Sequence, residues 1–266
     1  MNWFSKLFKK KNKVAIVRLE GTIAPSMTFG TSLSDVSVSK TIEKAFSMKK
    51  LSAVVLIINS PGGSPAQSSL IAARVKRLAK KNKIHVLAFC EDVAASGGYW
   101  LACAADEIFA DENTIIGSIG VISSGFGFHE LIERQGIERR VYTSGEDKSI
   151  LDPFRPQKQA DIKKLKKLQG QIHENFINHV KLSRGEKIKS DDIFSGEFWL
   201  ASEALNKGLI DGVSHLEDVI SNRFGDDCKL IKVSSKKSFF GRLTGSVYNS
   251  LIETVANKIN LSRYGL

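Results

Sequence analysis

The sequence predicts an α/β fold built from repeated strand–helix units. Residues 53–58 form a continuous apolar run rich in β-branched side chains, which is typical of a strand buried on both faces. A glycine-rich turn follows, and then a helical pattern over 64–80 with its apolar positions on one side. The same order repeats at once, with a strand over 84–89 and a helix of small residues over 95–104. Strands and helices alternating at this spacing are typical of ββα or βαβ units.

The other expected elements continue this pattern on both sides. Before the two units we expect a strand over 13–19, a polar loop over 21–34 and a helix over 37–48. After them we expect short strands at 108–110, 120–123 and 138–143, and helices at 128–135, 156–183, 202–207 and 216–222. No low-complexity linker interrupts the chain. We therefore expect one domain over 13–224, between an N-terminal segment at 1–12 and a C-terminal extension at 225–266.

The composition is that of a globular protein with a surplus of positive charge. Of 266 residues, 42% are hydrophobic and 25% charged, which is ordinary for a domain with a proper core. The formal net charge is +11, and much of it lies in the first 13 residues and around 158–167. Solvated helix faces explain such lysines, and contact with a membrane surface is the alternative. No basic strand interleaved with aromatic residues and no recognition-helix pattern occurs, so we expect no nucleic-acid partner.

The N-terminus predicts contact with a membrane surface. Trp3, Phe4, Leu7 and Phe8 recur at helical spacing among lysines, which is typical of a short basic amphipathic anchor. No apolar core of about seven residues follows, so the segment does not read as a signal peptide. No apolar run of about 18 residues predicts a transmembrane helix. We therefore expect a cytoplasmic protein with peripheral contact at the inner membrane.

The cysteines and histidines predict no metal or cofactor site. Cys90, Cys103 and Cys228 are odd in number and scattered, which argues against a disulfide framework or a zinc site. Cys90 and Cys103 lie in apolar surroundings, so we expect both to be buried as small hydrophobic residues. The five histidines show no metal-ligand spacing. We therefore expect neither a metal nor a cofactor.

The most informative stretch is the strand-to-helix passage around Ser96. Ser96 stands between an apolar strand and a small-residue helix, with Gly97 and Gly98 directly behind it. A serine there presents its hydroxyl at a helix start, where backbone N–H groups are unpaired. The earlier strand ends in a similar turn at Gly62 and Gly63, and two such turns can supply a nucleophile and an oxyanion hole. The alternative for Ser96 is a helix N-cap.

Five motifs in order connect this chain to a known family. They are Asn59-Ser60-Pro61-Gly62-Gly63, Ala95-Ser96-Gly97-Gly98-Tyr99, Ala105-Asp106-Glu107-Ile108, Gly117-Ser118-Ile119-Gly120-Val121 and Gly145-Glu146-Asp147-Lys148. Each motif alone is weak, but together they resemble the signal peptide peptidase A family of serine peptidases, over residues 13–218. The resemblance implies the Clp protease/crotonase fold and a serine–lysine dyad. It also implies a short form with one catalytic unit, assembled into a ring whose subunits share active sites. The family's usual N-terminal transmembrane anchor is missing here, which puts the membrane topology in question.

The resemblance also implies a role for each site residue. Ser96 matches the nucleophile, and Lys148 matches the general base, although an exposed loop lysine is the plain alternative. A lysine can serve as a base only if burial lowers its pKa towards neutrality. Ser118 matches the serine that orients the lysine amine, with an ordinary turn serine as the alternative. Gly63 and Gly97 match the oxyanion donors, and the sequence leaves open whether Gly62 or Gly63 donates.

These expectations together predict a serine endopeptidase that cleaves apolar, extended peptides such as cleaved signal-peptide remnants. One rival is an acyl-CoA enzyme of the crotonase type, which would use the same oxyanion geometry. The other is a catalytically silent scaffold that binds apolar segments at membranes. Ser96 and Lys148 occurring together at the family spacing disfavour both rivals.

Overall fold

The computed structural model of the chain describes residues 12–25, 32–145, 148–234 and 264. These residues belong to two compact units, one made of 1–119 with 177–266 and the other of 120–176. Each unit is described by itself. Nearly all of the expected N-terminal segment and most of the expected C-terminal extension lie outside the described residues.

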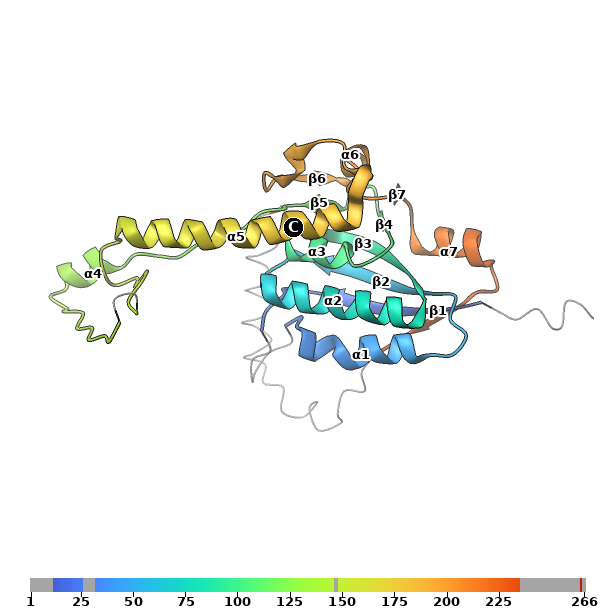
Figure 1. The fold of residues 1–266 in the computed structure, drawn as a ribbon, viewed down its shortest axis with the longest axis horizontal. Helices are drawn as coiled ribbons and strands as arrows, with labels where there is room; N and C mark the ends of the chain where they lie inside the picture. The colour runs from blue at the N-terminus through green and yellow to red at the C-terminus, as the bar shows by residue number, and fades with distance from the viewer. Residues whose placement is uncertain (1–11, 26–31, 146–147, 235–263, 265–266) are drawn as a thin grey trace, which may run out of the picture. The chain divides into compact units, whose positions relative to one another are not determined.

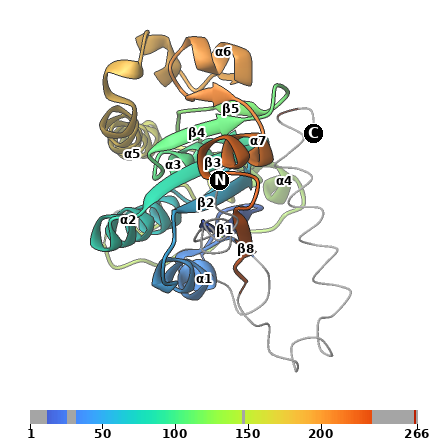
Figure 2. The ribbon, with the colours of Figure 1, turned by 90° about the vertical axis from the view of Figure 1, so that its right-hand side faces the viewer.

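The first unit is built on one largely parallel β-sheet (Figure 1). Its strands are β1 (Lys13–Glu20), β2 (Ala53–Ser60), β3 (His85–Ala95), β4 (Glu107–Ala110), β5 (Ile115–Gly117), β6 (Phe198–Leu200), β7 (Gly212–Val213) and β8 (Lys229–Lys232). The main path runs β6-β5-β3-β2-β1-β8, while β4 pairs with β3 and β7. Every pair is parallel except β5 with β6. Figure 2 shows β5 towards one edge of this sheet and β8 at the other.

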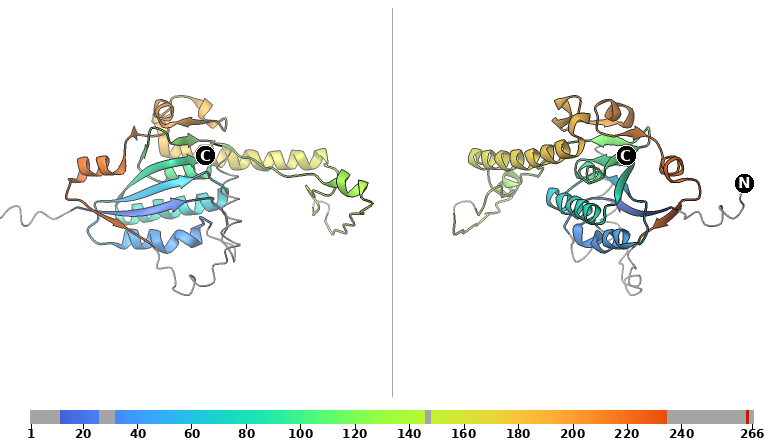
Figure 3. Two further views of the ribbon diagram at one scale, coloured as in Figure 1. Left: turned by 180° about the vertical axis from the view of Figure 1, so that it is seen from behind. Right: turned by 45° about the vertical axis from the view of Figure 1, so that its right-hand side comes forward.

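Helices cover both faces of the sheet because successive strand residues point to opposite sides. On one face, Val219 and Ile220 of α7 (Leu216–Phe224) lie in one apolar cluster with strand residues. The strand members of that cluster are Val14, Ile16, Ala53, Val55, Leu87, Phe89 and Phe109. The other face carries helices α1 (Asp35–Ser47), α2 (Pro65–Asn82) and α3 (Gly97–Ala102), which lie in front of the strands in Figure 1. In the left view of Figure 3, from the opposite side, the strands lie in front of these helices.

Local signals start the helices where the sequence predicts them. Ser34 and Ser37 form a capping box at the start of α1, since each side chain accepts from the other's backbone N–H. The Ser64 hydroxyl accepts from Gln67 N at 3.4 Å, and Pro65 occupies the first turn of α2. Helix α2 therefore begins directly behind the Gly62-Gly63 turn.

The second unit holds helix α4 (His129–Arg134) and the first part of helix α5 (Gln159–Arg184). Among its described residues no strand occurs, so the strands expected at 120–123 and 138–143 are wrong. A strand needs a neighbouring strand to complete its backbone hydrogen bonds, and residues 138–143 pair with none. The helices expected at 128–135 and 156–183 are confirmed within a few residues.

The rest of the first unit follows the prediction with additions. Helix α6 (Ala201–Asn206) and α7 match the two expected short helices, and two 3₁₀ turns at Gly185–Lys187 and Asp191–Phe194 precede them. The strands β5, β6, β7 and β8 were not predicted from the sequence. Each is two to four residues long, which is too short for an alternating pattern to stand out.

Buried polar and thiol groups complete this unit. Arg184 is 2% exposed, and its guanidinium binds both carboxylate oxygens of Asp211 at 2.7 and 3.1 Å and donates to Gly208 O. Cys90 and Cys103 are buried, as predicted. Burial raises the pKa of the Cys103 thiol to about 11, so this group stays protonated and unreactive near neutral pH.

Candidate active site

The chain turns sharply at Ser96, between the end of β3 and the start of α3. Ser96 has φ 52° and ψ −120°, a backbone conformation that non-glycine residues rarely adopt. Its N–H donates to Gly117 O at 2.8 Å, and its carbonyl accepts from Trp100 N at 3.0 Å. Its side chain makes no helix-capping hydrogen bond, so the N-cap role that the sequence left open is absent. The turn leaves the hydroxyl half-exposed at the end of the sheet.

The glycine turn after β2 lies against this serine. A side chain at Gly62 would place its Cβ 2.8 Å from Ser96 Cβ and 2.6 Å from Gly97 N. The two turns therefore approach as closely as their backbones allow, and only glycine fits at position 62. The Ser60 hydroxyl donates to Gly21 O at 2.7 Å and accepts from Gly62 N at 3.2 Å, which braces the turn from beneath.

The N–H groups of Gly63 and Gly97 are free of protein partners in the described part of the chain. Within 12–25, 32–145, 148–234 and 264, neither N–H donates a hydrogen bond. The N–H of Gly62 donates to Ser60 instead. Of the pair that the sequence left open, Gly63 thus carries the unpaired donor, and it lies at an exposed position. Unpaired backbone donors beside a serine hydroxyl have the chemistry of an oxyanion hole.

Strand β5 brings Ser118 beside Ser96. Gly117 pairs with Ala95 in the parallel register of β3 and β5, so the next residue of each strand, Ser118 and Ser96, emerges at the same edge. Ser118 is 8% exposed and also has φ 52°. Its N–H donates to Glu197 O at 2.7 Å, which fixes its backbone to the chain just before β6. The sequence places Ser118 in a motif, and the structure places it beside Ser96.

An aromatic ring lies at the same place. Tyr264 packs against an apolar cluster of Val93, Ala95 and Ile115. Its ring meets Phe198 edge-on with centroids 5.1 Å apart. Its hydroxyl lies 3.4 Å from Ser118 Oγ and from Pro61 O. Sequence reasoning missed Tyr264, because nothing in its neighbourhood along the chain marks a contact with residues 146 positions away.

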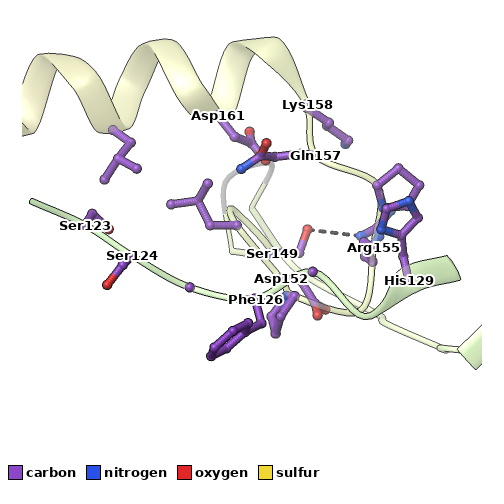
Figure 4. A pocket seen from close by; sticks show the side chains of 16 residues that line it. Ser123, Ser124, Phe126, His129, Ser149, Asp152, Arg155, Gln157, Lys158 and Asp161 are labelled. Carbon is purple, nitrogen blue, oxygen red and sulfur yellow. Dashed lines mark hydrogen bonds between the residues drawn. The ribbon is translucent and has the colours of Figure 1, made fainter. Parts of the chain in front are cut away.

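Lys148 belongs to the second unit, so its pairing with Ser96 stays a prediction. It lies in a turn, its N–H donates to Gly145 O at 3.4 Å, and its side chain is exposed. The next residue, Ser149, lines a hollow of about 540 Å³ in this unit (Figure 4). There the Arg155 guanidinium donates to Ser149 Oγ at 3.1 Å. The segment after Lys148 is thus held by its own side chains.

The histidines take structural positions in the part of the chain that the structure describes. His85 and His215 face Glu107 and Asp111, at 2.9 and 2.8 Å. The Asp106 carboxylate accepts from Val86 N at 2.8 Å. In the same described part, no group of three or more histidine, cysteine, aspartate or glutamate residues is arranged to hold a metal ion. Within those residues, too, no helix is both long and apolar enough to span a bilayer.

The sequence profile of peptidase family S49 matches residues 78–224, more than half of the chain. The chain belongs to this family. The match confirms the family that the five motifs predict.

Two relatives of this S49 chain differ from it greatly in length. It is 47% identical over 87% of its length to a Brucella abortus (strain 2308) protein named Na(+)/H(+) antiporter NhaA, of which it covers 32%. It is 31% identical over 82% of its length to the chloroplastic serine protease SPPA of Arabidopsis thaliana, of which it covers 33%. The chain thus spans about a third of the first curated relatives it matches. The antiporter name describes the whole of a much longer protein.

A solved structure shares the fold of this S49 chain. It is a variant of the 1510-N membrane-bound stomatin-specific protease in complex with a substrate peptide. The match has a TM-score of 0.55 at 16% identity and covers 92% of this chain and 99% of that one. At this identity the likeness concerns the fold alone. It confirms the α/β fold that the sequence predicts.

Proposed function

We propose that this chain is a serine endopeptidase in which Ser96 is the nucleophile. The observation that supports the proposal is the strained turn at Ser96, which Gly97 follows directly and against which the Gly62-Gly63 turn packs, with the N–H groups of Gly63 and Gly97 unpaired in the described chain. Backbone strain at a solvent-accessible serine is typical of a catalytic position, where the surrounding structure holds one productive geometry. Membership of peptidase family S49 supports the same chemistry.

The proposed reaction is acyl transfer to Ser96 followed by hydrolysis. Lys148, with its amine neutral, accepts the hydroxyl proton as Ser96 Oγ bonds to the peptide carbonyl carbon. The N–H groups of Gly63 and Gly97 stabilise the negative oxygen of the tetrahedral intermediate. Lys148 then gives the proton to the leaving amine as the C–N bond breaks. A water molecule, deprotonated by the same amine, hydrolyses the ester and regenerates the serine.

Ser118 is the proposed partner of the Lys148 amine. Its hydroxyl lies at the sheet edge that carries Ser96, and its backbone is fixed by Glu197 O. A base is efficient only if a third group holds its orientation. Lys148 is exposed in the described chain, so the contacts that would hold its amine have to come from substrate or from a neighbouring subunit.

The surface of the second unit supports assembly with further copies of the chain. Among its described residues only Phe176 is buried, so this unit has almost no core. Its exposed large apolar side chains are Ile122, Phe126, Phe128, Leu131, Ile137, Tyr142, Leu151, Phe154 and Leu168. So many apolar side chains on so small a unit mark an interaction surface. We propose a homo-oligomeric ring in which this surface contacts a neighbouring subunit and completes the site.

The proposed substrates are apolar, extended peptides such as signal-peptide remnants. The cluster of Val93, Ala95 and Ile115 lies beside the nucleophile and already accepts the ring of Tyr264, so it suits an apolar side chain. We further propose that the catalytic domain is 13–224 and that segment 1–12, outside the described residues, contacts the inner face of a membrane.

The experiment is cleavage of a pooled fluorogenic peptide set, with parallel labelling by a fluorophosphonate probe, between about pH 6 and 10. Ser96→Ala should abolish both signals. Lys148→Ala should lower cleavage by about 10²–10⁴-fold, as expected for loss of a general base, whereas the matched variant Lys167→Ala should not change it. Ser118→Ala should lower the cleavage rate and shift the alkaline side of its pH–rate profile. Cleavage that survives Ser96→Ala would contradict the proposal, and a function retained without cleavage would indicate the scaffold.

A further inference from the structure

Strand β3 changes its neighbours just before the nucleophile. Its residues 87–90 pair with β4, whereas 93–95 pair with β5. On its other side, Ile58 of β2 faces Cys90 and Ser60 faces Ala94, so Asn59 alone faces the stretch 91–93. Strand β3 therefore carries a bulge at Glu91 and Asp92. Bulges occur next to active sites, where they bend a strand and re-aim the side chains that follow.

This bulge sets the meeting point of all the site's parts in the first unit. Beyond it, β3 ends at Ser96, β2 ends at the Gly62-Gly63 turn and β5 ends at Ser118. After the bulge, Ala94 of β3 pairs with Ser60 of β2 and with Ile116 of β5. This register decides which residues of the three strands lie opposite one another. A change in the bulge would move Ser96 relative to both partners at once.

Three contacts hold the bulge from three different segments. Arg18 of β1 binds Glu91 with two hydrogen bonds, of 2.8 and 2.6 Å. Asn59 of β2 donates to Asp92 at 2.5 Å. Thr114, just before β5 and 1% exposed, donates from Oγ1 to the Cys90 carbonyl at 3.2 Å. We call these three contacts the bulge clamp.

We propose that the bulge clamp positions Ser96 for catalysis, and that Arg18, Asn59 and Thr114 are therefore positioning residues. The inference rests on the proposed function of Ser96. None of the three contacts involves Ser96, Gly63 or Ser118, so the clamp acts only through the strand that it bends.

The energetics favour a positioning role over a purely stabilising one. The Arg18 and Glu91 side chains are 45% and 39% exposed, and ion pairs of that kind contribute little to stability. In contrast, a strained residue such as Ser96 keeps its conformation only if the surrounding structure over-determines it. The bulge clamp contacts β3 from β2 and from the residue before β5, about five residues before Ser96, and so provides that constraint.

The test compares variants of the clamp with a matched ion pair elsewhere in the sheet. The clamp variants are Thr114→Val, Asn59→Ala and Glu91→Gln, alone and together. The control is Glu107→Gln, because Glu107 of β4 makes a similar two-bond pair with Arg223, at 2.5 Å for each bond. Thr114→Ser keeps the hydroxyl and serves as the conservative rescue.

Three measurements follow each variant: fluorophosphonate labelling of Ser96, kcat and KM for a cleaved peptide, and hydrogen exchange of residues 93–98. The combined clamp variant should lower labelling and kcat by about 10–100-fold, the loss that a misplacement near 1 Å produces. KM should change little, and exchange at 93–98 should become faster. Thr114→Ser and Glu107→Gln should behave as wild type.

Wild-type labelling and kcat in the combined variant would overturn the proposal, as would an equal loss in Glu107→Gln. If wild type and Ser96→Ala are both unlabelled and inactive, the proposed function fails instead. Hydrogen exchange then decides the clamp by itself. Faster exchange at 93–98 in the clamp variants alone would support the positioning role, and unchanged exchange would overturn it.

Discussion

The substitution Gly62→Ala should disable the candidate site, because its new Cβ atom would clash with the chain at residues 95–97. The new Cβ would lie 2.6 Å from Gly97 N, 2.8 Å from Ser96 Cβ and 2.9 Å from Ala95 O. All three atoms belong to the turn at Ser96, so relief of the clash has to move this turn. Gly62 also has φ +97°, which costs an alanine about 1–3 kcal/mol. The forced contacts add about 1–3 kcal/mol of overpacking.

Gly21 provides a control that separates the two costs. It has φ +93°, and a Cβ there meets no atom within 4 Å. Gly21→Ala should therefore lower the free energy of unfolding by the strain alone, about 1–3 kcal/mol. Gly62→Ala should lower it by about 2–6 kcal/mol in total.

The assay is thermal melting of both variants together with fluorophosphonate labelling of Ser96. Each kcal/mol corresponds to about 2–4 °C in Tm for a chain of this size, so Gly62→Ala should melt several degrees below Gly21→Ala. Labelling should persist in Gly21→Ala and disappear in Gly62→Ala. Equal Tm values for the two variants, with labelling intact in both, would refute the reasoning.

Three further predictions concern other parts of the first unit. Burial lowers the pKa of His179 from 6.5 to about 4. Between these two pH values the unfolded chain binds more protons than the folded one. The contribution of neutral His179 to the free energy of unfolding is therefore fully present above pH 6.5, and about 3 kcal/mol of it should be lost as the pH falls to about 4. His179→Gln, which keeps a donor for Trp100 O, should remove that fall in acid titrations followed by circular dichroism. Arg184→Met should lower the free energy of unfolding in urea by about 1.5–3 kcal/mol, because it removes the charged hydrogen bonds from the half-buried Asp211 carboxylate, which keeps Lys187 and Ile108 N as donors; a loss below about 1 kcal/mol, the range of a surface pair, would contradict this. Tyr264→Ala should speed labelling of the nucleophile by uncovering the apolar cluster, whereas Tyr264→Phe keeps the ring and should not; equal rates in the two would show that the ring covers nothing.

The core of the fold was predictable because its signals are local. The continuous apolar runs of β2 and β3 and the helix over 64–80 appear at their expected places. The sequence indicates Ser96 as a candidate site residue because a strand, this serine and two glycines follow one another directly. Likewise, the choice between Gly62 and Gly63 needed only one further fact, that the N–H of Gly62 is already bound by Ser60.

The parts that escaped prediction depend on contacts distant in sequence. Strand β5 is three residues long and exists because it pairs with β3 and β6. Residues 138–143 end in three residues that favour strands, Val141, Tyr142 and Thr143, yet no partner strand lies beside them. Tyr264 reaches the site from near the end of the chain. The secondary-structure propensities of single residues predict none of these contacts, because each depends on pairing between segments distant in sequence.

The bond from Ser118 N to Glu197 O has a consequence for biosynthesis. Ser118 and Ser96 leave the ribosome well before residue 197, yet Ser118 is fixed only when Glu197 and β6 have joined β5. At about 5–20 residues per second, several seconds separate the synthesis of the proposed nucleophile from the completion of its surroundings. A nascent chain therefore carries an unfinished site throughout that interval. The proposed catalysis at Ser96 would therefore begin only after residue 197 has left the ribosome.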